Sequence, residues 1–212
     1  YTDPLFFGAI KKNLGGRLRV CVSGGAPLPP HVMEWFKVVV CDHFLEGYGQ
    51  TELFAAGIST DDDLMALHEP GRDPACDAGL YLPYITSEVK LVNVDSMNYV
   101  VTSNPPRGEL CVRATTLMSG YYKDPRKTAE AIDKDGFLHT GDIAVILPTG
   151  RIKIIDRIRS MFKLSQGEYV SAEYIEQVLG YSPVIAQAFV HGDSDKNFPI
   201  AIIVPNKAVL RD

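Results

Sequence analysis

The chain has 212 residues, of which 46% are hydrophobic and 22% charged, and its net charge is −5 at pH 7. This length can bury a sizeable core, in one large domain or two small ones. The acidic balance argues against nucleic acid or an anionic membrane surface as the main partner. No apolar run approaches the roughly 20 residues that span a bilayer. The four cysteines are widely spaced and have no C-x-x-C pair, which argues against a disulfide framework or a zinc site and favours a reducing compartment.

The first fifty residues alternate between strand and helix patterns. An apolar run at 18–22 leads into the glycine-rich segment 23–27. Apolar residues at helical spacing fill 31–37, and the apolar run 38–41 has the pattern of a buried strand. A strand, a glycine turn, a helix and a second strand in this order predict a parallel α/β unit.

After residue 52 the pattern changes to loops and short strands. Acidic and Gly/Pro-rich residues at 61–74 predict a loop, and a short helix is expected at 128–132. Runs of strand type follow one another along this part of the chain: 88–94, 99–102, 109–113, 143–147 and 151–155. Prolines and a glycine at 105–108 predict a turn, and Pro-Thr-Gly at 148–150 predicts a hairpin. These runs predict a small antiparallel sheet or barrel.

The last third of the chain predicts a helix followed by two strands. Ser171 can cap the helix, and Gly180 with Pro183 predicts its end. The strands are expected at 185–191 and 199–204. Residue 1 is tyrosine, and the final residues resemble the opening of a helix without a stop signal. Both ends are therefore expected to be cuts through a longer protein.

Two glycine segments could carry binding chemistry. Residues 23–27 (Ser-Gly-Gly-Ala-Pro) allow a flat ligand to approach bare backbone, although an ordinary strand–helix turn has the same composition. Residues 47–52 (Gly-Tyr-Gly-Gln-Thr-Glu) offer an aromatic face, a hydroxyl for a phosphate oxygen and a carboxylate for Mg²⁺. The alternative for this turn is a solvated loop that caps the next segment.

Two later segments add polar groups. Asp142 ends the segment 135–142 (Asp-Gly-Phe-Leu-His-Thr-Gly-Asp) and could accept both hydroxyls of a ribose. The alternative is a turn that satisfies its own backbone. His139 is expected to be structural, without a catalytic role. Residues 154–169 pass from an apolar strand into a basic stretch and a polar glycine turn, which also fits a solvated face at a domain edge.

In this order and at these separations, the four segments resemble the adenylate-forming superfamily of AMP-binding enzymes, and most closely the long-chain fatty acyl-CoA synthetases. The resemblance covers nearly the whole chain, and four ordered motifs are more specific than one glycine motif. It implies an α/β and α+β fold. Residues 1–157 would end a large domain, with a βα unit at 1–60 and a β-barrel-like subdomain at 75–157. Residues 158–212 would form a hinge and the start of a small mobile domain.

The resemblance also implies which residues would bind the base of ATP and border the acyl chain. Gly25, Ala26 and Pro27 would line the adenine pocket. Tyr48 would stack on the base, and Gly49 would border the acyl site.

The remaining implied roles concern the phosphates, the ribose and the hinge. Thr51 would bind phosphate and Glu52 would bind Mg²⁺, and these two are the residues expected to take part in catalysis. Asp142 would hold the ribose hydroxyls with help from Arg157. The hinge falls at Arg159, where the family more often has lysine.

The activity implied by the resemblance is the activation of a long-chain fatty acid. Its carboxylate would attack the α-phosphate of ATP, and the thiol of CoA would then attack the acyl-adenylate. The Pro-Lys-Gly phosphate loop and the C-terminal lysine of the family are not in this sequence, so the chain alone is expected to be inactive. The alternatives are an aryl or amino acid activating ligase, or a nucleotide-binding or scaffolding module without catalysis.

The expected partners are therefore the fatty acid, ATP and CoA, without nucleic acid. The expected location is intracellular. The full-length protein could lie on the cytosolic face of a membrane such as the endoplasmic reticulum or peroxisome, and any membrane association would come from regions outside this chain.

Overall fold

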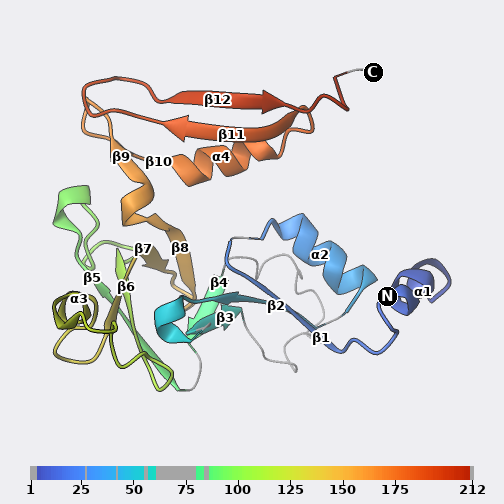
Figure 1. Cartoon of the computed structure of the whole chain (residues 1–212), viewed down its shortest axis with the longest axis horizontal. Coiled ribbons are helices and arrows are strands. Elements are labelled where there is room, and N and C mark those ends of the chain that lie inside the picture. The colour runs from blue at the N-terminus through green and yellow to red at the C-terminus, as the bar shows by residue number, and fades with distance from the viewer. Residues whose placement is uncertain are drawn as a thin grey trace.

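The computed structural model describes residues 4–26, 28–41, 43–54, 57–60, 80–83 and 86–210. The expected loop at 61–74 and Pro27 lie outside these residues. The helices, with the 3₁₀ turns marked η, are α1 (Pro4–Asn13), α2 (Pro30–Val39), η1 (Thr51–Leu53), η4 (Asp95–Met97), α3 (Pro125–Ala131), η5 (Ile158–Ser160) and α4 (Ala172–Gly180). The strands are β1 (Val20–Gly24), β2 (His43–Tyr48), β3 (Ile58–Thr60), β4 (Leu80–Pro83), β5 (Ser87–Val92), β6 (Arg107–Ala114), β7 (Leu138–Ile146), β8 (Ile152–Arg157), β9 (Met161–Lys163), β10 (Tyr169–Ser171), β11 (Ile185–His191) and β12 (Ile200–Pro205) (Figure 1).

The first eight strands form one mixed sheet with the order β1-β2-β3-β4-β8-β7-β6-β5. β1 and β2 are parallel, and every other neighbouring pair in the sheet is antiparallel. The expected α/β character and the antiparallel strands are confirmed. Within the described residues the sheet is open, with β1 and β5 at its edges, and the expected barrel is not closed.

The parallel unit β1-α2-β2 differs from the prediction in one place. The expected strand at 38–41 is instead the end of α2 and the turn after it. Val39, Val40 and Cys41 are buried, and they pack with the half-buried Phe36 of the same helix. A short apolar run does not distinguish a buried helix end from a strand, because both bury consecutive apolar side chains.

The antiparallel part also departs from the prediction around residue 100. The expected strand at 99–102 is a turn with one isolated bridge, between Tyr99 and Val94. The expected turn at 105–108 is shorter, because Arg107 already begins β6. Prolines at 105 and 106 lack the N–H that a strand ladder requires, so the turn ends where the prolines end.

The main core lies where η1 and β3 meet strands β6 to β8. Its buried residues are Leu53, Ile58, Leu110, Val112, Leu138, Ala144 and Ile152. Full burial of a leucine contributes about 1.5–3 kcal/mol. Because Leu53 is fully buried, this core anchors the turn that carries Thr51 and Glu52 to β6 and β7.

The predicted hairpin and the C-terminal elements are confirmed. β7 and β8 pair around a turn closed by the Leu147 N–H to the Arg151 carbonyl, at 2.8 Å. Ser171 caps α4 by accepting the Tyr174 N–H. α4, β11 and β12 form a separate layer, which η5 and β9 join to the large sheet (Figure 1). The expected helix at the end is a turn over 207–210, and 211–212 lie outside the described residues.

Candidate nucleotide-binding site

The two glycine segments meet at the carboxyl ends of β1 and β2. Gly24 pairs with Gly47 in the parallel register. A side chain at Gly24 would begin only 2.8 Å from the Gly47 carbonyl oxygen, so the close approach requires glycine. Gly25 follows with φ of +91°, a conformation that glycine adopts without strain. Carboxyl ends of neighbouring parallel strands are where α/β sheets bind ligands, and Gly25 and Ala26 are exposed there.

A buried carboxylate that the sequence patterns did not single out fixes this edge. Glu46 is fully buried near the end of β2. Its Oε1 accepts the Leu28 N–H at 3.0 Å, and its own N–H donates to Thr60 Oγ1 at 2.9 Å. Buried charge is retained only with hydrogen-bond partners. Glu46 therefore ties Leu28, the residue that follows the 23–27 segment, to β2. In the sequence, the signal for this role is one acidic residue inside a mostly apolar strand.

The structure brings Tyr48 and Asp142 into direct contact, although they are 94 residues apart in the sequence. The Tyr48 hydroxyl donates to Asp142 Oδ2. Gln50 donates from Nε2 to the same oxygen at 3.1 Å and to the Thr140 carbonyl at 2.8 Å. Tyr48, expected at the base, and Asp142, expected at the ribose, are thus hydrogen-bonded to each other. Gln50, which was not predicted, donates to the same Asp142 oxygen and helps to fix the pair.

Burial controls the protonation of this pair. Burial raises the pKa of Tyr48, and the neighbouring Asp142 carboxylate raises it further. Tyr48 therefore stays a hydrogen-bond donor at neutral pH. Burial also raises the pKa of Asp142, while the hydrogen bonds from Tyr48 and Gln50 and the positive charge of Arg157 act in the opposite direction.

Arg157 lies beside Asp142 because the two are paired across β7 and β8. Its Nε is 3.5 Å from Asp142 Oδ1. The Arg157 side chain is 61% exposed, whereas the Asp142 side chain is 4% exposed. Asp142 is thus covered by its own partners, and a ribose could reach it only if the Arg157 side chain or the Tyr48 hydroxyl moved aside.

Thr51 and Glu52 lie in η1, directly after this group. Thr51 is exposed and Glu52 is half-buried. The Tyr121 hydroxyl donates to Glu52 Oε1 at 2.8 Å, and the Met118 N–H donates to the Glu52 carbonyl at 2.8 Å. The hydrogen bond to Glu52 raises the pKa of Tyr121, whereas the positive charge of Arg159 lowers it. A carboxylate fixed in this way fits Mg²⁺, which is commonly bound through one or two carboxylates plus substrate phosphates.

The part of β7 that precedes Asp142 is fastened to β6. Thr140 Oγ1 donates to the Leu110 carbonyl at 2.6 Å and accepts the Asp142 N–H at 3.1 Å. Glu109 Oε1 accepts the Gly141 N–H at 3.0 Å, and Gly141 has φ of +73°. These contacts hold Asp142 in place on β7 before any ligand binds.

A family model described as AMP-binding enzyme matches residues 4–122, which is more than half of the chain. The chain belongs to the AMP-binding enzyme family. It is 44% identical over 214 residues to "Long chain acyl-CoA synthetase 7, peroxisomal" of Arabidopsis thaliana, covering 100% of this chain and 29% of that protein. It is 44% identical over 208 residues to "Long-chain-fatty-acid--CoA ligase 1" of Homo sapiens, covering 98% of this chain and 28% of that protein.

Solved structures of the same superfamily share the fold of this AMP-binding chain. The adenylation domain of a carboxylate reductase from Mycobacterium chelonae superposes with a TM-score of 0.76 at 33% identity, covering 96% of this chain and 29% of that one. The A domain of a carboxylic acid reductase from Segniliparus rugosus, solved with AMP and a carboxylic acid, gives a TM-score of 0.72 at 32% identity, covering 96% of this chain and 30% of that one. The expected superfamily and the similarity to the long-chain synthetases are confirmed.

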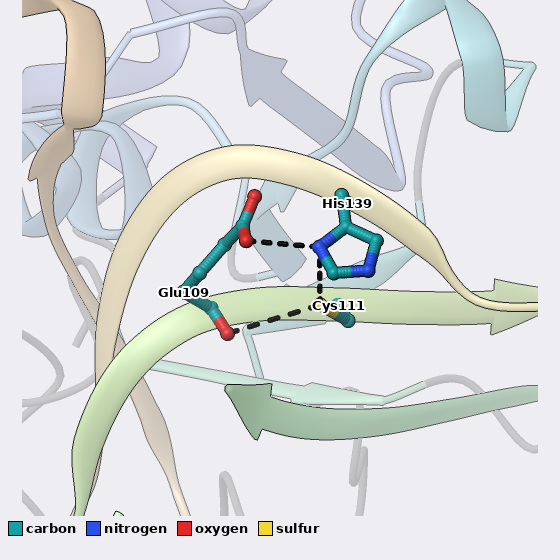
Figure 2. A group of neighbouring side chains, drawn as sticks. All are labelled: Glu109, Cys111 and His139. Atoms are coloured by element: carbon teal, nitrogen blue, oxygen red, sulfur yellow. Dashed lines mark hydrogen bonds and ion pairs between the residues drawn. The ribbon is translucent and has the colours of Figure 1, made fainter. Parts of the chain in front are cut away.

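Two further facts complete the description of this AMP-binding chain. His139, expected to be structural, lies against Glu109 and Cys111 on β6 (Figure 2). In the described part of the chain no helix has both the length and the apolar content to cross a membrane.

Proposed function

We propose that this chain is part of an enzyme that activates a long-chain fatty acid with ATP and transfers the acyl group to CoA. The observation that carries the proposal is the contact between Tyr48 on β2 and Asp142 on β7, which joins the residues expected at the base and at the ribose. The 44% identity to long-chain acyl-CoA synthetases, over essentially the whole chain, supports the same substrate class.

The nucleotide would lie across the ends of β1, β2 and β7. The bare backbone of Gly25 and Ala26, with Pro27, would face the adenine, and the Tyr48 ring would stack on it. Asp142 would accept the two ribose hydroxyls, with Arg157 beside it. Asp142 would then lose the hydrogen bond from Tyr48 and gain two from the ribose, so the net gain is about one hydrogen bond to a charged group.

The phosphates would lie at η1. Thr51 would donate its hydroxyl to a phosphate oxygen, and Gly49 would border the acyl group. Glu52 would hold Mg²⁺, which neutralises phosphate charge, and Tyr121 would keep the Glu52 carboxylate oriented. These residues position and neutralise the reactants rather than react with them.

The proposed reaction has two steps. A fatty acid carboxylate oxygen forms a bond to the α-phosphorus of ATP, and the bond to the β-phosphate oxygen breaks, which releases pyrophosphate. The CoA thiolate then bonds to the acyl carbon, and AMP leaves with the electron pair of the broken C–O bond. Because the chain spans about 30% of the length of its curated relatives, we expect it to lack part of the machinery and to be inactive alone.

We also propose that the domain boundary lies after β8. β8 is the last strand of the large sheet, and the strands that follow pair only among themselves in the described residues. Residues 1–157 would then belong to the large AMP-binding domain, and 158–212 would begin the small mobile domain, with the hinge at Arg159 in η5. Lys163 and the turn at 165–169 would face the site in the thioester step.

The proposed location is a reducing compartment, because the described cysteines Cys21, Cys41 and Cys111 are free. The full-length protein would work on the cytosolic face of a membrane such as the endoplasmic reticulum or peroxisome, attached through regions outside this chain. Two relatives from Arabidopsis thaliana carry "peroxisomal" in their names.

A screen of pyrophosphate release by the full-length protein tests the proposed function. Acids of graded chain length are supplied with ATP, Mg²⁺ and CoA, and aryl acids and amino acids serve as controls. We expect release with long-chain fatty acids and little with the controls. Release with aryl or amino acids alone would favour another adenylate-forming ligase, and no release with any acid would favour a non-catalytic module.

A further inference from the structure

Three side chains of different chemistry converge on one face of the sheet, between β6 and β7 (Figure 2). Glu109 and Cys111 are two residues apart on β6, and side chains at this spacing point to the same face of a strand. His139 is the cross-strand partner of Cys111 on β7. Glu109 pairs with Ile143, and Cys111 pairs with His139. The segment of β7 between these two partners is longer than the segment of β6 between Glu109 and Cys111, so β7 has a bulge here.

The separations of the three groups match the dimensions of a small metal site. Cys111 Sγ lies 3.6 Å from His139 Nδ1, and His139 Nδ1 lies 2.9 Å from Glu109 Oε2. The three ligand atoms all lie within 4.8 Å of one another. A tetrahedral zinc ion, with Zn–S of about 2.3 Å and Zn–N of about 2.0–2.1 Å, separates the sulfur and nitrogen by about 3.5 Å. The Glu109 oxygen would have to retreat only by a few tenths of an ångström.

A carboxylate also lies near the other nitrogen of the His139 ring. His139 Nε2 faces Asp133 Oδ2 at 3.9 Å, and Lys90 Nζ holds that oxygen at 2.7 Å. Lys90 and Asp133 thus form an ion pair beside the far nitrogen of the His139 ring. A carboxylate behind a ligating histidine is the usual support of a zinc site, because it orients the ring and makes it more basic.

We propose that Glu109, Cys111 and His139 bind one zinc ion, with a water molecule as the fourth ligand. Thiolate, imidazole and carboxylate together select zinc or a similar transition metal over Mg²⁺, which prefers oxygen ligands alone. The sequence patterns argued against a zinc site because the four cysteines are widely spaced and have no C-x-x-C pair. Such patterns do not reveal the proposed ligands, which come from two strands that are adjacent only in the folded sheet.

Cobalt titration of the full-length protein at pH 8 tests the proposal, with Co²⁺ as a spectroscopic substitute for Zn²⁺. A cobalt–thiolate bond gives a charge-transfer absorption band that oxygen and nitrogen ligands do not give. We expect the band to saturate at one equivalent and to disappear on addition of Zn²⁺. Cys111→Ser should abolish it. Cys41→Ser is the matched control, because Cys41 is also buried and lies in the turn after α2, away from β6 and β7. This variant should keep the band.

A second variant leaves the thiol in place. His139→Gln should weaken Co²⁺ binding at least tenfold, because it removes a ligand while Cys111 stays unchanged. No band at excess Co²⁺, or a band that persists in Cys111→Ser, would overturn the proposal. If Cys111→Ser fails to fold, an unchanged Co²⁺ affinity in His139→Gln would also overturn the proposal.

Discussion

At the scale of single residues, Asp142 serves two opposing demands. Its side chain is only 4% exposed and this burial raises its pKa, so ionisation at neutral pH is costly in the folded chain. The proposed ribose contact nevertheless requires the carboxylate form. Tyr48, Gln50 and Arg157 reduce that cost by donating to the carboxylate or by placing positive charge beside it. Two predictions separate the binding role from the cost in stability.

The first prediction concerns binding. Asp142→Ala in the full-length protein removes the acceptor of the ribose hydroxyls. We expect ATP binding to weaken by about 1.5–3 kcal/mol, the range for hydrogen bonds to charged groups, or roughly 10- to 150-fold in Kd. Calorimetry with ATP measures the change, and 2′,3′-dideoxy-ATP is the control, since its affinity should change much less. An equal loss for both nucleotides would contradict a ribose role.

The second prediction concerns stability and pH. A group whose folded pKa is raised contributes stability that is present below its unfolded pKa and is lost as pH rises through the folded pKa. Asp142→Asn imitates the protonated carboxyl at every pH. We therefore expect this variant to gain stability relative to the wild type as pH rises from about 4 towards 7, an interval that begins at the ordinary aspartate pKa. Thermal melting at several pH values measures the difference, and a difference that is constant with pH would contradict the raised pKa.

The motifs identified Tyr48, Thr51, Glu52, Asp142 and Arg157 as candidates because each lies inside or beside a short segment of recognisable composition. The patterns gave no reason to choose the residues that hold these candidates in place. These supporting residues form hydrogen bonds with partners between 14 and 92 residues away in the sequence: Glu46, Gln50, Glu109 and Tyr121. Such contacts depend on strand register, which a single sequence does not state.

At the scale of elements, local signals succeeded where turn or cap chemistry decides the structure. The β7–β8 hairpin and the start of α4 were predicted from their turn and cap residues. The run at 38–41 was misjudged because burial, and not periodicity, sets its composition. α3 begins earlier than expected, since Asp124 caps it and Pro125 occupies its first turn.

The cap of α3 gives the third prediction. Asp124 Oδ1 accepts the Lys127 N–H at 3.0 Å, and loss of such a cap costs about 1 kcal/mol, within a range of about 0.5–2. We expect Asp124→Ala to lower the protection of α3 amides in hydrogen exchange by that amount. Asp124→Ser keeps a cap acceptor without the charge and should lose much less. Equal losses of protection in the two variants would contradict the cap and indicate that the charge of Asp124 stabilises the helix instead.

The hinge gives the fourth prediction. Arg159 lies in η5, the short turn that joins β8 to β9. Arg159→Pro fixes φ and stiffens the turn, so we expect acyl-adenylate formation to persist while thioester formation slows in the full-length protein. Single-turnover assays of the two steps, with and without CoA, measure the effect. Equal loss in both steps would place the hinge elsewhere.

At the scale of the whole molecule, one open sheet connects the glycine segments at the ends of β1 and β2 with Asp142 on β7. β4 makes the connection by pairing with both β3 and β8. The order of strands is not evident from the sequence, because β5, which follows β4 in the chain, lies at the far edge of the sheet. The strand that pairs with β4 on that side is β8, three strands later in the chain. The separate layer of α4, β11 and β12 fits the proposed mobile domain (Figure 1).

The central claim is that this AMP-binding chain contributes its nucleotide site to an enzyme that forms an acyl-adenylate. Exchange of labelled pyrophosphate into ATP, measured with the full-length protein and without CoA, isolates that step. We expect exchange that requires a long-chain fatty acid and is strongly reduced in Asp142→Ala. Exchange that does not depend on a carboxylic acid, or cleavage of ATP to ADP and phosphate, would contradict the claim.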